Sequence, residues 1–132
     1  MNGDLVLLSI LVAVTVLAGC NQREAPVEPL AFDKATWLAT DSHRSMANPR
    51  HQMSLALVQQ GTLIGKSEDD VRLILGDPMY ALENWPTNGA RQLQYRIGPS
   101  TSLTGLSFEA LFVDLSAPSG VVVKAMTGQR NF

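Results

Sequence analysis

A polar capping pair followed by apolar residues at helical spacing marks the first clear element, a helix that begins at Asn48 and Pro49. Asparagine is a favoured N-cap, and proline suits the first helical position because the N–H that it lacks would have no partner there. Three apolar residues then share one face of the predicted helix: Met53, Ala56 and Leu57. Gly61 predicts the end of the helix, because glycine readily adopts the left-handed conformation found at helix C-termini.

A second helix is predicted between Ser67 and Gly76. Serine is a good N-cap, and the acidic residues at 68–70 complement the positive end of the helix dipole. The apolar positions form one buried stripe: Val71, Ile74 and Leu75. Gly76 predicts the C-terminal stop, and Pro78 prevents the helix from resuming.

The hydrophobic period changes after residue 90, which predicts strands. Three apolar residues alternate with polar ones, as is typical of a half-buried strand: Leu93, Tyr95 and Ile97. Segments 108–115 and 121–126 are predicted as further strands joined by a short loop. The segment 80–92 is interpreted as an extended loop. We therefore expect an α+β fold, with two short helices packed on a three-stranded antiparallel sheet in the order α-α-β-β-β.

The part before Asn48 has weaker patterns. The segment 32–40 favours one or two helical turns, with Asp33 near the N-cap and Trp37 as an anchor. It lies within residues 20–47, which we interpret as a cysteine, Cys20, followed by a flexible linker, because the tract after the cysteine is polar and contains prolines. Residues 48–132 are assigned to one globular domain.

The start of the chain, residues 1–19, has the pattern of a secretory signal. The apolar run at 5–16 is too short to cross a hydrocarbon core of ~30 Å, and its length fits the apolar part of a signal peptide. Four residues then resemble the bacterial lipobox: Leu17, Ala18, Gly19 and Cys20. The resemblance implies cleavage before Cys20, a diacylglycerol on its thiol and a further acyl chain such as palmitate on the new amino group. Several acyl chains give stable membrane anchoring, whereas one alone is marginal.

One feature departs from the pattern of a secretory signal. The residues before the apolar run include Asp4 and no Lys or Arg, whereas signal peptides normally begin with positive charge. The alternative interpretation is a core strand or helix that ends in a buried free cysteine. Under the enteric sorting rule, aspartate after the lipidated cysteine retains a lipoprotein in the inner membrane. Asn21 occupies that place, so the expected location is the outer membrane, facing the periplasm.

Composition excludes several classes of site. The 132 residues include 10 Lys and Arg against 12 Asp and Glu, a net charge of −2, which gives no basic face for nucleic acid. One cysteine rules out a disulfide framework or a zinc ribbon. His43 and His51 are the only histidines, and two ligands do not define a metal site. We expect no metal and no cofactor.

Catalysis is not expected either. Ser67 has no G-x-S-x-G context, and the acidic residues beside it are explained by the helix dipole. The aromatic residues Trp85, in a turn-rich loop, and Tyr95 are the candidate partner contacts. The alternative role for Trp85 is packing over the sheet edge. We expect a partner to bind at an open edge strand or on the helix-free face of the sheet.

The order of elements and one short motif resemble the SmpA/OmlA-like lipoproteins. The matching motif residues are Gly65, Ser67, Val71, Leu75, Gly76 and Pro78. Tyr95 stands for the aromatic strand of that family, and residues 112–114 stand for its hydrophobic strand that ends in an acid. The resemblance covers about residues 55–126. The same small fold occurs, duplicated, in secreted β-lactamase inhibitor proteins.

The resemblance implies an α-α-β-β-β fold and a non-enzymatic, protein-binding role. The family includes the small lipoprotein subunit of the outer-membrane β-barrel assembly machine. We therefore expect an envelope protein, lipid-anchored through Cys20, that binds another envelope protein in outer-membrane protein assembly or envelope integrity. The alternative function is a secreted inhibitor or ligand-binding module on the same scaffold.

Overall fold

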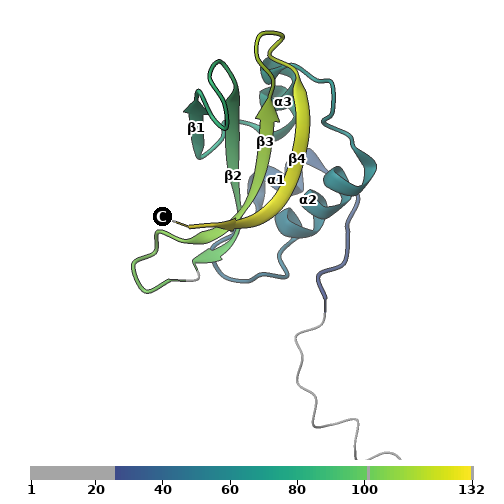
Figure 1. The fold of residues 1–132 in the computed structure, drawn as a ribbon. Coiled ribbons are helices and arrows are strands. Elements are labelled where there is room, and N and C mark those ends of the chain that lie inside the picture. The colour runs from purple at the N-terminus through teal and green to yellow at the C-terminus, as the bar shows by residue number, and fades with distance from the viewer. Residues whose placement is uncertain (1–25, 101, 132) are drawn as a thin grey trace, which may run out of the picture.

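One four-stranded antiparallel sheet, in the strand order β1-β2-β3-β4, carries three helices against one of its faces (Figure 1). The computed structural model describes residues 26–100 and 102–131. The helices are α1 (Lys34–Ala39), α2 (Pro49–Gln60) and α3 (Glu68–Leu75). The strands are β1 (Tyr80–Glu83), β2 (Arg91–Ser100), β3 (Phe108–Leu115) and β4 (Val122–Arg130).

The α+β class is confirmed, but the expected numbers of two helices and three strands are wrong. The additional strand β1 lies in the segment 80–92 that was interpreted as a loop. Three of its four residues are exposed, so β1 lacks the alternation that a buried face imposes. Its pairing with β2, from Tyr80 opposite Gln94 to Glu83 opposite Arg91, rests on backbone hydrogen bonds that sequence does not reveal.

The additional helix α1 lies in the segment assigned to the linker, where the one or two helical turns predicted at 32–40 are confirmed, with Asp33 as the N-cap and Trp37 buried. Asp33 caps it by accepting a hydrogen bond of 2.9 Å from the backbone N–H of Thr36. The hydroxyl of Thr36 also donates to this carboxyl group, and the hydroxyl bond together with the backbone bond lowers the pKa of Asp33. Trp37 is completely buried in the core, and the N–H of Leu30 donates to the carbonyl of Gln52 at 3.0 Å. The folded part therefore begins at least at Leu30, ahead of the expected boundary at residue 48.

The predicted ends of α2 are confirmed. Asn48 accepts from the N–H of His51 at 3.0 Å, and Gly61 ends the helix in the left-handed conformation. The amide of Asn48 also donates to the carbonyl of Ile97 at 2.7 Å. One capping side chain therefore starts α2 and ties it to β2.

Two aromatic side chains hold the end of α3. The indole N–H of Trp37 donates to the carbonyl of Leu75, and the hydroxyl of Tyr95 donates to the carbonyl of Gly76, each at 2.9 Å. Burial raises the pKa of Tyr95, which keeps its hydroxyl protonated as a donor. Gly76, with φ 81° and ψ −166°, has a conformation that is essentially restricted to glycine.

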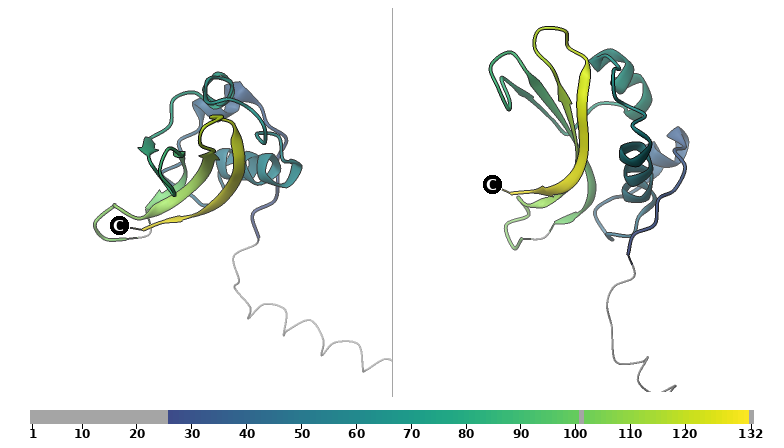
Figure 2. Two further views of the ribbon diagram at one scale, coloured as in Figure 1. Left: turned by 45° about the horizontal axis from the view of Figure 1, so that its top comes forward. Right: turned by 45° about the vertical axis from the view of Figure 1, so that its right-hand side comes forward.

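The sheet has one covered and one open face. Alternation along the strands directs one set of residues into the core beneath the helices: Leu93, Tyr95, Ile97, Leu111, Val113 and Leu115. The pairing register shifts between Arg96 and Ser100 and between Asp114 and Leu115, and such irregularities bend strands. In the right-hand view of Figure 2 the strands curve away from the helices, which leaves the helix-free face concave.

The helices of residues 26–100 and 102–131 are all too short or too polar to span a bilayer. The expected lipobox, from Leu17 to Cys20, lies outside the described residues, so the signal and the anchor stay predictions.

The Gly76→Ala substitution tests the end of α3. We expect a loss of about 1–3 kcal/mol in the free energy of unfolding, because alanine disfavours this backbone conformation. Its Cβ would also lie 3.2 Å from Leu38. Urea denaturation measures the effect. Gly128→Ala is the control, since the added Cβ would make an ordinary contact with Phe112 at 3.6 Å. Equal stability of the two variants would contradict the account.

Candidate binding groove on the helix-free face

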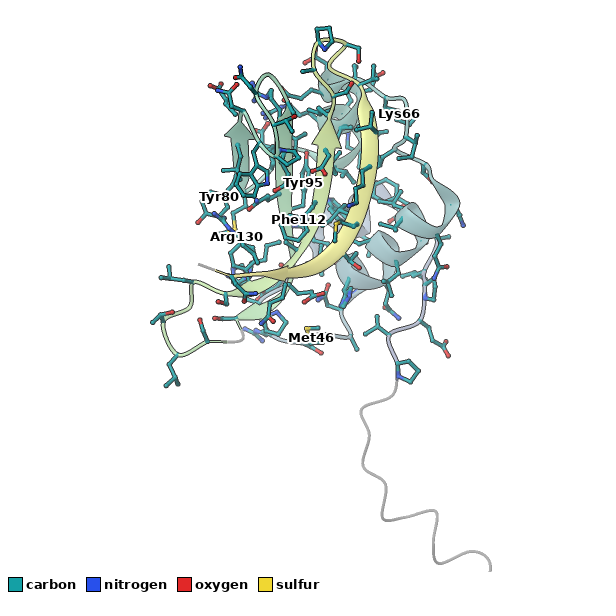
Figure 3. All side chains as sticks on the ribbon, in the orientation of Figure 1. Met46, Lys66, Tyr80, Tyr95, Phe112 and Arg130 are labelled. Atoms are coloured by element: carbon teal, nitrogen blue, oxygen red, sulfur yellow. The ribbon has the colours of Figure 1, made fainter. Side chains whose placement is uncertain are left out.

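A groove of about 390 Å³ lies on the helix-free face, between the β1–β2 loop and the end of β4. Its apolar lining comes from Leu82, Trp85, Phe112 and Met126. Its polar lining comes from Gln92, Gln94, Gln129, Arg130 and Asn131. Figure 3 labels Phe112 on β3 and Arg130 on β4. Large apolar side chains with a few polar groups are the usual composition of a ligand site.

Two glutamines and one aspartate form a directed chain of hydrogen bonds under this groove. Gln94 Nε2 donates to Gln92 Oε1, and Gln92 Nε2 donates to Asp114 Oδ1, each at 2.8 Å. The carboxylate of Asp114 accepts only, so it fixes which end of each amide points along the chain. The last atom of the chain, Gln94 Oε1, is therefore an acceptor.

That acceptor is buried without a hydrogen-bond partner among the described residues. Gln94 is 3% exposed, yet it lines the groove. An unpaired buried polar atom costs about 1–3 kcal/mol, which natural folds normally avoid. The wall of the groove thus includes a residue with a buried hydrogen-bond acceptor that the described residues do not use.

Aromatic rings position the charged end of the groove. Tyr80 and Phe108 stack with their ring centroids 6.4 Å apart. The Arg130 guanidinium lies 3.8 Å from the Tyr80 centroid, and that of Arg96 lies 5.1 Å from the Phe108 centroid. Burial lowers the pKa of Arg130 and Tyr80 opposes this shift, but arginine stays protonated in proteins. Arg130 therefore brings positive charge to the lining.

The structure separates the two candidate contacts. Trp85 is 52% exposed and lines the groove, in a loop where Asn84 Oδ1 accepts from the N–H of Gly89 at 2.9 Å. Trp85 thus combines contact with the sheet and access to solvent, so it stays a candidate. Tyr95 is 2% exposed and points into the core, so its interpretation as a partner contact is wrong.

The family-like motif lies on the helical side, away from the groove lining. Ser67 caps α3 by accepting from the N–H of Asp70 at 3.2 Å, and the N–H of Gly65 donates to Val122 at 2.8 Å. The remaining members form or follow α3: Val71 and Leu75 are buried, Gly76 ends the helix and Pro78 precedes β1. These residues position the helical layer.

Sequence reasoning missed most of the groove. It treated Gln94 as the polar side of a half-buried strand, and it gave no role to Gln92 or Met126. One signal was present in the sequence: Phe112 is large and apolar but stands on the opposite side of β3 from Leu111 and Val113. Apolar residues on both sides of a strand indicate that both faces have contacts.

A second hollow of about 550 Å³ lies beside the α1–α2 loop. Its charged groups already have partners within the fold. Arg50 donates to the carbonyl of Trp37 at 2.9 Å and lies 4.7 Å from the centroid of that ring. Asp41 accepts from the N–H of His43 at 2.9 Å, which lowers the pKa of Asp41. These contacts hold the loop, so the groove on the sheet is the stronger candidate.

Within residues 26–100 and 102–131, no group of three His, Cys, Asp or Glu side chains is placed to hold a metal ion. Comparison with family models, curated proteins and solved structures finds no match for this chain.

Paired leucine substitutions test the amide chain. Gln92→Leu leaves the buried amide of Gln94 without a hydrogen-bond partner for its NH2 group or its oxygen, so we expect a loss of about 1–3 kcal/mol in the free energy of unfolding. Adding Gln94→Leu removes this unpaired amide. The double variant should therefore lose less free energy of unfolding than the sum of the losses in the two single variants, by at least about 1 kcal/mol. Urea denaturation measures this cycle. Additive losses, within about 0.3 kcal/mol, would refute the directed chain.

Proposed function

We propose that this chain is a lipid-anchored, non-catalytic module of the cell envelope that binds another protein through the groove on its helix-free face. The observation that carries the proposal is the groove itself, where exposed Trp85 stands beside Phe112, Met126 and a buried free acceptor. Tryptophan in a desolvated apolar setting is the residue type that most often dominates protein–protein binding. Amides, rings and one guanidinium suit recognition of a partner.

The proposed anchor places this groove near a membrane. Ten steps of chain separate Cys20 from Leu30, where contact with the fold begins, so the tether reaches about 35 Å at most. Confinement to such a layer raises the effective concentration for membrane-bound partners. Asn21 favours the outer membrane, facing the periplasm. The sharper role, in outer-membrane protein assembly or envelope integrity, rests on the resemblance of the motif from Gly65 to Pro78.

The Cys20→Ser substitution tests the anchor. We expect the wild-type chain to fractionate with membranes and to begin at an acylated Cys20 in mass spectrometry. The serine variant, which lacks the thiol that takes the diacylglycerol, should leave the membrane fraction. Membrane association that is unchanged in the variant, or an unmodified N-terminus in the wild type, would refute lipid anchoring.

Alanine substitution of two exposed apolar residues tests the binding face. Trp85→Ala should weaken partner binding by about 30-fold, the effect of losing a hot spot worth ~2 kcal/mol. Leu73→Ala is the matched control, because Leu73 is 68% exposed on α3 in the helical layer. Quantitative co-purification from cross-linked envelopes compares both variants with the wild type. Equal recovery of the same partners with Trp85→Ala and wild type would exclude this face.

A further inference from the structure

The groove offers an acceptor whose direction is set by a residue outside its lining. Asp114 accepts from Gln92, Gln92 accepts from Gln94, and the amide oxygen of Gln94, a residue that lines the groove, has no donor among the described residues. Rotating either amide would place two oxygens or two NH2 groups against each other. The group that completes this site must therefore be a hydrogen-bond donor.

The surrounding side chains narrow the chemistry of that donor. Trp85, Phe112 and Met126 supply apolar walls, which favour an apolar group next to the donor. Arg130 supplies positive charge in the same lining, which favours a carboxylate. A peptide has all three groups close together: a secondary amide N–H, an apolar side chain and a carboxylate. A lipid chain lacks the donor, and a sugar would bury several hydroxyls against apolar walls.

We infer that the groove binds an extended peptide segment of the partner protein in which an apolar residue carries or adjoins a carboxylate. The backbone N–H of that residue donates to Gln94 Oε1, its side chain packs against Trp85 and Met126, and the carboxylate pairs with Arg130. This inference rests on the proposed protein-binding function and gives the chemistry of the bound segment.

N-acetyl-L-leucine is the smallest probe that holds all three groups, because it has one amide N–H, one apolar side chain and one carboxylate. The full chain, purified from membranes in detergent and labelled with ¹⁵N, is titrated while the side-chain amide signals of Gln92 and Gln94 are followed by NMR. We expect a dissociation constant on the order of 1 mM, given the small size of the probe. N-acetyl-N-methyl-L-leucine, which lacks the N–H, should bind about tenfold more weakly.

Two variants separate recognition from a structural role. Gln94→Leu should bind N-acetyl-L-leucine and its N-methyl analogue equally, because the acceptor that distinguishes them is gone. Arg130→Gln should keep that discrimination but lose the preference for N-acetyl-L-leucine over N-acetyl-L-leucinamide, which lacks the carboxylate. If either Gln94→Leu or Arg130→Gln does not fold, the other variant still tests the inference through its own contact.

Three results would overturn the inference: no binding of N-acetyl-L-leucine to the wild type, equal binding of the N-methyl analogue to the wild type, or preferential binding of N-acetylglucosamine. The last result would assign the groove to a glycan. These results would not refute the proposed protein-binding function. That function is tested by the loss of co-purified partners in Trp85→Ala, which does not require the Gln94 contact.

Discussion

Two backbone carbonyls at the end of α3 hold the helical layer to the sheet. Leu75 accepts from the Trp37 indole and Gly76 accepts from the Tyr95 hydroxyl, so segments nearly sixty residues apart meet at one helix end. The last carbonyls of a helix lack partners within it, and buried ones must find them elsewhere. Satisfying them here fixes α1, α3 and β2 together on one side of the sheet and leaves the other side open.

The arrangement of side chains on the open face of the sheet follows from the packing of the buried face. Side chains of a strand alternate between faces, so packing Leu93 and Tyr95 into the core places Gln92 and Gln94 together on the opposite side of β2. Asp114 stands opposite Gln92 on β3 and gives their amides a single direction. The same residues that stabilise the fold thus determine where an acceptor faces the groove and which chemistry can complete it.

The parts of the fold that could be predicted are those with local causes. Asn48, Ser67 and Gly76 delimit helices through their own backbone and capping preferences. Strand β3 has the predicted bounds because turn residues directly follow its apolar run. Strand β1 escaped prediction because its pairing is long-range and its residues are exposed. The burial of Gln94 could not be predicted because its neighbours, Tyr80 on β1 and Phe112 on β3, are brought beside it by long-range strand pairing. A polar residue in an alternating strand otherwise indicates a solvated position.

The central claim, that the helix-free face is where a partner binds, is tested most directly by photocrosslinking in living cells. A benzoylphenylalanine is introduced at Met126, which lines the groove, and in a second strain at Leu73, which is exposed on α3. The account predicts a crosslinked protein of discrete mass from position 126 and none from position 73. Crosslinks from position 73 alone, or the same products from both positions, would contradict it.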